Sequence, residues 1–177
     1  FIINQQTLSG AVIQMVSHGI YVAALFIVFG ALEARRGSRQ IGDFGGAWKP
    51  APVLGVVFLI AMFAAVGLPG LNGFVGEFTI LLGVFQQSPD VAAIAALTLI
   101  FGAWYMLWTF QRVMQGTPAA GVEGMADIRR VELLALLPLL VLIFVIGILP
   151  NIILTPANGT VAELVSQVTA TAVALLP

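Results

Sequence analysis

Four long apolar segments occupy most of this 177-residue sequence. They run over Leu8–Leu32, Val53–Phe85, Val91–Met114 and Val131–Leu149. A helix that crosses a bilayer needs about 20 mostly apolar residues, and these segments have about that length or more. None of them alternates polar and apolar residues throughout, as the strands of a membrane barrel do. The sequence therefore predicts an all-α membrane protein with four transmembrane helices.

The composition excludes several other classes of protein. Only 8% of the residues are charged, whereas soluble domains carry about 25%. A net charge of −1 leaves no basic face for a nucleic acid. The sequence has no cysteine, which excludes disulfides and iron–sulfur ligation within it, and its single histidine argues against a zinc site. Since the sequence starts at Phe1 without a basic region before its first apolar run, we expect a piece of a longer protein rather than a signal peptide.

The second apolar segment contains the run GLPGLNGFVGEF over residues 67–78. Pro69 removes a backbone donor and clashes with the preceding turn, and Gly70 and Gly73 loosen the backbone. We therefore expect a helix that is broken near Leu68–Gly73. Transporters use such breaks at their ion sites, whereas a simple proline kink is the plainer alternative.

The loops predict how the chain is oriented. All seven basic residues lie either between the first two segments or from the end of the third segment to the start of the fourth: Arg35, Arg36, Arg39, Lys49, Arg112, Arg129 and Arg130. Four crossings place all of them on one side, which the positive-inside rule makes cytoplasmic. Two separate crossings in the second segment would divide them between both sides. We therefore interpret that segment as one crossing with a broken helix.

Residues 151–177 differ in character from the transmembrane region, which we place at residues 1–150. We expect a turn at Thr155–Gly159 and then an amphipathic helix over 160–176, lying along the outer surface. A disordered tail is the alternative. At the helix ends, we expect Asp90 to cap the third span and Asp127 to cap the fourth.

The first segment carries a stripe of polar residues. Gln14, Ser17, His18 and Tyr21 are spaced so that they share one face of a helix. Lipid cannot satisfy such groups, so the stripe must face protein or water. It serves either as hydrogen-bonding contact between helices or as the wall of a proton path with His18 as a relay, since the pKa of histidine lies nearest physiological pH.

Glu77 is the one acidic residue in the interior of a predicted span. A charge at the bilayer centre costs about 2.5–3.5 kcal/mol on insertion scales, which a purely structural role rarely justifies. In such surroundings a carboxyl group can hold or release a proton near neutral pH. We therefore predict proton transfer by Glu77 and His18, with Gln14, Ser17, Tyr21 and Asn72 lining the polar path. We expect no residue with a redox role and no metal site.

Two blocks of the sequence resemble a known family. Residues 14–19 (QMVSHG), followed by Leu25-Phe26, are similar to the antiporter-like membrane subunits of respiratory complex I and to their relatives in cation/proton antiporters and membrane-bound hydrogenases. Residues 67–78 resemble the same family, and Glu at position 77 is similar to its M-type branch (chain 4), because the other two large branches carry Lys there. The loop departs from the family pattern, with Gly37-Ser38-Arg39 in place of His-Thr-Arg.

The resemblance implies a role in a larger assembly. It implies a fragment with the last four of about fourteen spans, Glu77 as the terminal proton carrier, and His18 on the same polar axis. It also implies proton translocation within NADH–quinone oxidoreductase, coupled to quinone reduction elsewhere, in a bacterial plasma membrane or in an organellar inner or thylakoid membrane. NADH, FMN, iron–sulfur clusters and quinone would be bound by other subunits, and neighbouring membrane subunits and lipid would be the partners. A cation/proton antiporter subunit, a membrane-bound hydrogenase subunit and a non-transporting scaffold remain as alternatives.

Overall fold

The computed structural model describes residues 2–174, and these form an all-helical bundle without strands. The helices are α1 (Gln5–Arg36), α2 (Pro52–Ala65), α3 (Asn72–Phe85), α4 (Pro89–Met114), α5 (Arg130–Ile148) and α6 (Asn151–Ala174), with the short 3₁₀ helix η1 (Ile41–Asp43) after α1. Of the described helices, α1, α4 and α5 are long and apolar enough to cross a membrane, and α2 and α3 are shorter apolar helices. The predicted class of fold is therefore confirmed, while the number of crossings stays a prediction.

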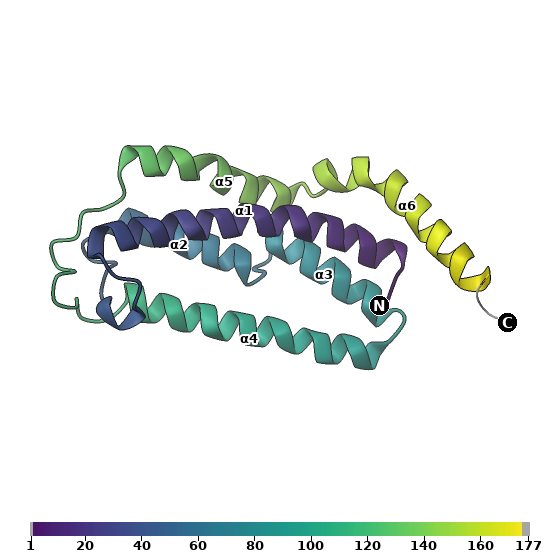
Figure 1. The fold of residues 1–177 in the computed structure, drawn as a ribbon, viewed down its shortest axis with the longest axis horizontal. Helices are drawn as coiled ribbons and strands as arrows, with labels where there is room; N and C mark the ends of the chain where they lie inside the picture. Colours follow the sequence, from purple (N-terminus) through teal and green to yellow (C-terminus); the bar gives the residue numbers. More distant parts are fainter. Residues whose placement is uncertain (1, 175–177) are drawn as a thin grey trace.

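The predicted break in the second segment is confirmed. Residues Val66–Leu71 are not helical and separate α2 from α3. The two short helices follow one another alongside α1 and run in the same direction, opposite to α1 (Figure 1). The side-chain amide of Asn4, just before α1, donates to Gly83 O near the end of α3, as expected if α1 and α3 are antiparallel. The two short helices thus form one continuous path along α1, and the interpretation of this path as a single crossing stays a prediction.

Local sequence signals explain where several helices begin and end. The Asn4 side chain accepts a hydrogen bond from the Thr7 amide at 2.8 Å, and Thr7 returns a bond in a capping box that starts α1. At the other end, Gly37 has a φ of +68° and closes the helix. Pro52 and Pro89 each occupy the first position of their helix, where the missing N–H has no intrahelical partner to lose.

All seven basic residues lie at one end of the bundle, where α1 and α4 end and α2 and α5 begin (Figure 1). This grouping of the basic residues at one end is the one expected when the chain passes along the bundle four times. The assignment of this end to the cytoplasmic side stays a prediction, because it rests on the positive-inside rule.

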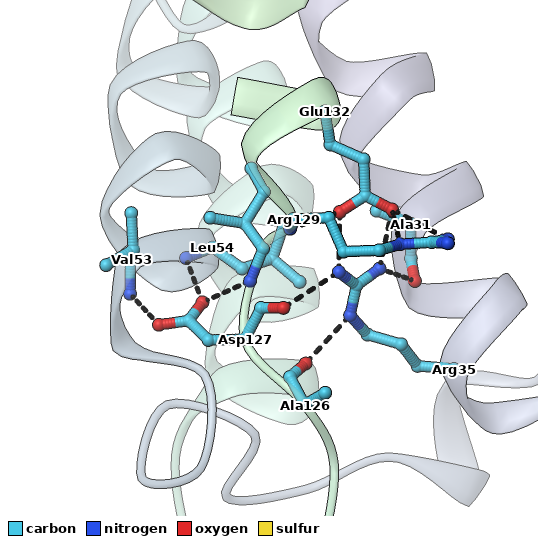
Figure 2. Close-up of polar contacts among 9 residues, drawn as sticks. Ala31, Arg35, Val53, Leu54, Ala126, Asp127, Arg129 and Glu132 are labelled. Carbon is cyan, nitrogen blue, oxygen red and sulfur yellow. Dashed lines mark hydrogen bonds and ion pairs between the residues drawn. The ribbon is translucent and has the colours of Figure 1, made fainter. Parts of the chain in front are cut away.

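Figure 2 shows how this basic end is held together. Arg35 of α1 donates to the carbonyl groups of Ala126 and Asp127 in the loop before α5, and it forms an ion pair with Glu132 in the first turn of α5. Its side chain is 7% exposed and that of Glu132 is 16% exposed. The loop before α5 is thereby fixed to the end of α1.

Asp127 does not cap the fourth span as predicted. Its two carboxylate oxygens accept hydrogen bonds from the backbone amides of Val53 and Leu54, both at 3.0 Å, so it caps α2 (Figure 2). The start of α5 is instead capped by Glu132, which accepts from the amide of Arg129. The prediction for Asp90 is also wrong, because no side-chain hydrogen bond caps α4. Asp127 thus caps a helix distant in the sequence, while α5 is capped by a residue of its own first turn.

The turn predicted at Thr155–Gly159 is wrong, since α6 runs through these residues from Asn151. Proline removes one hydrogen bond and crowds the preceding turn, but the rest of a helix can continue past it. The helix expected over 160–176 is present as far as Ala174, and the remainder of the expected range lies outside the described residues. Within the expected apolar stripe Val161 is buried and Val165 is half-buried, whereas Leu164 and Val168 are exposed.

Candidate functional site

The break between α2 and α3 brings Glu77 against the unwound backbone. Because α3 begins at Asn72, Glu77 stands in its second turn and faces back toward Gly67. A Cβ on Gly67 would collide with Glu77 Oε2, and Gly67 has a φ of +72°. The carboxyl group is half-buried in this position. The absence of a side chain at residue 67 therefore provides the space that the carboxyl group occupies.

Gln14 of α1 links Glu77 to the other polar groups. Its Nε2 donates to Glu77 Oε1 and to the hydroxyl oxygen of Tyr21, both at 3.3 Å. Gly76 makes this contact possible, because a Cβ on Gly76 would overlap the Gln14 side chain. The amide thus lies between a carboxyl group and a phenol.

His18 extends the same line. Its Nδ1 lies 3.1 Å from the Tyr21 hydroxyl, and the two rings meet edge to face with centroids 5.4 Å apart. Glu77, Gln14, Tyr21 and His18 therefore form a continuous hydrogen-bonded row. Tyr21 is buried at 5% exposure, Gln14 is half-buried and His18 is exposed, so the row runs from the helix break toward the surface of the bundle.

Ser17 and Asn72 form a separate pair beside the row. The Ser17 hydroxyl donates to the Asn72 carbonyl at 3.1 Å, and the Asn72 amide donates to the Ser17 carbonyl at 3.3 Å. Both residues are fully buried. These reciprocal bonds hold the first residue of α3 at a fixed height along α1.

The predicted site residues divide into three groups. Four of them form the hydrogen-bonded row, and Ser17 and Asn72 form the pair that aligns α3 with α1. Among the residues predicted to form the helix break, Pro69 and Gly70 lie in the unwound segment. The prediction is wrong for Gly73, which lies in the first turn of α3 and packs against Ala64 O of α2 and the ring of Tyr21. No bond in the structure joins Ser17 to the row, although the stripe on α1 suggested one common surface.

Gly67 and Gly76 are the residues of the site that the sequence analysis missed. Both belong to the glycine-rich run at residues 67–78, whose glycines were interpreted only as loosening the backbone at a helix break. Gly67 lies ten residues before Glu77 and Gly76 lies one residue before it, and this proximity in the sequence was the signal that could have identified them. Which side chain would fill the space beside each glycine depends on how α2, α3 and α1 pack.

The site has the chemistry of proton exchange. A carboxyl group, a phenol and an imidazole can each gain or lose a proton, whereas the carboxamide of Gln14 is not among the titrating side chains. Across residues 2–174, no basic side chain forms an ion pair with Glu77. No group of three potential metal-ligating side chains occurs in that part of the chain either.

Comparisons with known proteins identify similar sequences. Residues 1–102 match the family described as "NADH:quinone oxidoreductase/Mrp antiporter, TM". NADH-quinone oxidoreductase subunit M of Mycobacterium tuberculosis is 40% identical over 168 residues, which are 95% of this chain and 30% of that protein. NADH-ubiquinone oxidoreductase chain 4 of Marchantia polymorpha is 37% identical over 168 residues, which are 94% of this chain and 34% of that protein.

A solved structure with the same arrangement of helices is respiratory complex I from Thermus thermophilus with bound NADH. One of its chains matches with a TM-score of 0.78 at 34% identity, covering 89% of this chain and 34% of that one. The present chain thus spans about a third of the length of the relatives that it matches. The features described above therefore correspond to one part of those larger proteins.

Proposed function

The chain belongs to the NADH:quinone oxidoreductase/Mrp antiporter family of membrane proteins, and we propose that it forms part of a proton-translocating M-type subunit of NADH–quinone oxidoreductase. The observation that carries the proposal is the position of Glu77 at the helix break, bound to Gln14 and without an ion-pairing partner among the described residues. A single carboxyl group held between apolar helices next to unwound backbone is suited to taking up and releasing a proton. The similarity to the named relatives supports the assembly in which this happens.

Each residue of the site has a proposed role. Glu77 carries the proton, and His18 takes up or delivers one at the opposite end of the hydrogen-bonded row. Gln14 and Tyr21 connect the two ends, while Ser17 and Asn72 keep α3 aligned with α1. The break at Pro69 and Gly70 brings Glu77 against unwound backbone, and Gly73 at the start of α3 leaves room for the ring of Tyr21. Redox chemistry takes place elsewhere, since NADH, FMN, iron–sulfur clusters and quinone are bound by other subunits.

The two regions of the chain have different places in the proposed assembly. Residues 1–150 contribute transmembrane helices of a larger antiporter-like subunit, and residues 151–177 form a segment at the outer face that contacts a neighbouring subunit. Other membrane subunits of the complex and lipid are the partners. The bacterial relatives favour a bacterial plasma membrane, with organellar membranes as the alternative.

The proposal is tested with Glu77→Gln in the full-length protein, in inverted membrane vesicles that contain the assembled complex. NADH oxidation and proton uptake are followed together. We expect both to fall by an order of magnitude or more, because the amide cannot carry a proton. Glu123→Gln in the loop before α5 is the matched control, since Glu123 is exposed and lies at the basic end of the bundle, and it should leave both rates unchanged.

The alternatives predict different results. If Glu77→Gln is silent in an assembled complex, Glu77 and His18 serve only as contacts between helices and the protein is a scaffold. If the purified assembly lacks flavin and iron–sulfur subunits, the chain belongs to a cation/proton antiporter. If it contains hydrogenase subunits instead, the chain belongs to a membrane-bound hydrogenase.

A further inference from the structure

The carboxamide of Gln14 separates the two ends of the hydrogen-bonded row. Both of its hydrogen bonds use Nε2, one to Glu77 and one to Tyr21, each at 3.3 Å. Its Oε1 is buried and has no hydrogen-bond partner among the described residues. Since no bond holds the oxygen, the orientation of the amide is set by what Glu77 and Tyr21 offer it.

The carboxamide of a glutamine can change from hydrogen-bond donor to acceptor toward a given neighbour by a rotation of half a turn about χ3. That torsion is broad and roughly two-fold, and the rotation exchanges a double donor for an acceptor with two lone pairs. A carboxylate only accepts hydrogen bonds, whereas a protonated carboxyl group also donates one. The protonation state of Glu77 therefore selects which end of the Gln14 amide faces it.

The direction of the hydrogen bond at Glu77 determines the direction of the hydrogen bond at His18. With Glu77 ionised, one N–H of Gln14 donates to Glu77 and the other to the oxygen of Tyr21. The Tyr21 O–H is then left to donate to His18 Nδ1, which must carry no proton. With Glu77 protonated, its O–H donates to the Gln14 oxygen, and the Tyr21 O–H donates to the same oxygen. The Tyr21 oxygen then accepts from His18 Nδ1, which must carry a proton, so the neutral ring changes tautomer and Nε2 gives up the proton that it held.

We propose that Gln14 couples the two ends of the row, so that a proton on Glu77 favours a proton on Nδ1 of His18. No proton crosses the amide, because only the directions of the hydrogen bonds reverse. The inference rests on the proposed function of Glu77 as a proton carrier and adds how its state is communicated. Gln14 is a positioning residue, since it acts through Glu77 and Tyr21 and carries no proton itself.

The sign of this coupling distinguishes it from direct electrostatics. A negative carboxylate attracts a positive imidazolium, so direct attraction makes His18 lose a proton when Glu77 gains one. The amide-mediated route predicts the opposite change at Nδ1. Besides Glu77, Tyr105 of α4 is a titratable residue in the surroundings of Tyr21. The ion pairs among the described residues involve Arg35, Arg39 and Arg129, which lie at the basic end of the bundle.

Solid-state NMR of the full-length protein in liposomes tests the proposal. Histidine is labelled with ¹⁵N at both ring nitrogens and glutamate with ¹³C at the side-chain carboxyl. The resonances are assigned by their loss in His18→Phe and Glu77→Gln. As the pH is lowered through the titration of Glu77, we expect Nδ1 of His18 to gain a proton with the same midpoint while Nε2 loses one. Ordinary formation of imidazolium would instead leave a proton on both ring nitrogens.

Two variants interrupt the row at different points. Gln14→Leu removes both hydrogen bonds of the Gln14 amide. Tyr21→Phe removes only the hydroxyl group and keeps the ring, so it tests the coupling even if Gln14→Leu folds poorly. In each, Glu77 should still titrate while the matching change at Nδ1 is lost completely. Met15→Leu is the control, because Met15 is 67% exposed on the same helix, and it should behave as the wild type.

The outcomes separate this inference from the proposed function. If Glu77 titrates and Nδ1 does not gain a proton with it, the coupling is wrong and the role of Glu77 as a carrier stands. If Nδ1 follows Glu77 equally well in Gln14→Leu and Tyr21→Phe, the coupling does not pass through the row. If Glu77 stays in one protonation state over the whole pH range, the coupling and the proton-carrier role both fail.

Discussion

Glu77 Oε2 occupies the space that a Cβ on Gly67 would need, across the break that separates α2 from α3. The two residues are ten apart in the sequence, Gly67 has a positive φ, and the carboxyl group is the nearest neighbour of the position where its Cβ would lie. The geometry makes the smallest side chain at residue 67 a requirement for the position of the acid. Four predictions follow from this and from the other contacts of the bundle.

Gly67→Ala should displace the carboxyl group. The substitution strains a backbone with a φ of +72° and places a methyl group where Oε2 lies. We expect proton uptake to fall on the order of 10–100-fold, because small displacements of a reacting group have effects of that size. Gly70→Ala is the matched control, since Gly70 has a φ of +93° and nothing within 4 Å. It shares the strain of about 1–2 kcal/mol and should leave the carboxyl group in place. Equal losses in both variants would show that strain alone is responsible.

Removing the pair between Ser17 and Asn72 should loosen α3. Ser17→Ala takes away one hydrogen bond, so we expect a loss of about 0.5–1.5 kcal/mol in the free energy of unfolding. Asn72→Ala also leaves a hole at a fully buried position and should cost more. Thermal unfolding of the purified protein measures both, with Ser166→Ala on the exposed side of α6 as the control. An Asn72→Ala variant as stable as the wild type would contradict the prediction.

Arg35→Ala should destabilise the basic end of the bundle more than Arg39→Ala does. Arg35 pairs with Glu132 while both are largely buried, and breaking such a pair costs about 3–5 kcal/mol. Arg39 pairs with Glu33 at 82% and 41% exposure, where a pair is worth about 0–1 kcal/mol. The midpoints of thermal unfolding of the two variants give the comparison. The reverse order would show that the buried pair contributes little to stability.

Asp127→Ala should fray the start of α2. The carboxylate accepts from the amides of Val53 and Leu54, and loss of a capping side chain costs about 0.5–2 kcal/mol. Hydrogen exchange at these two amides should become faster, with Asp127→Asn giving an intermediate rate because one acceptor oxygen remains. Asp90→Asn provides the control, since the start of α4 has no side-chain cap. Unchanged exchange in Asp127→Ala would mean that another group replaces the cap.

Much of this protein was determined by the sequence itself. The length of the apolar runs predicted the three long helices and the broken second segment, because those properties depend on the residues of each segment alone. Proline and glycine near residue 69 located the break to within two residues at either end for the same reason. The rarity of charge inside the spans singled out Glu77 before any contact was known.

The tertiary structure decided which groups meet. Asp127 caps α2 rather than the nearer α5, and Gln14 stands between Glu77 and Tyr21, because helices distant in the sequence pack side by side. The continuous helix through Pro156 and Gly159 could not be predicted from those residues alone, since a proline or a glycine weakens a helix without always ending it. The spacing of residues along one helix fixes the face they share, but the partner on the opposite helix depends on how far the two helices are shifted against each other.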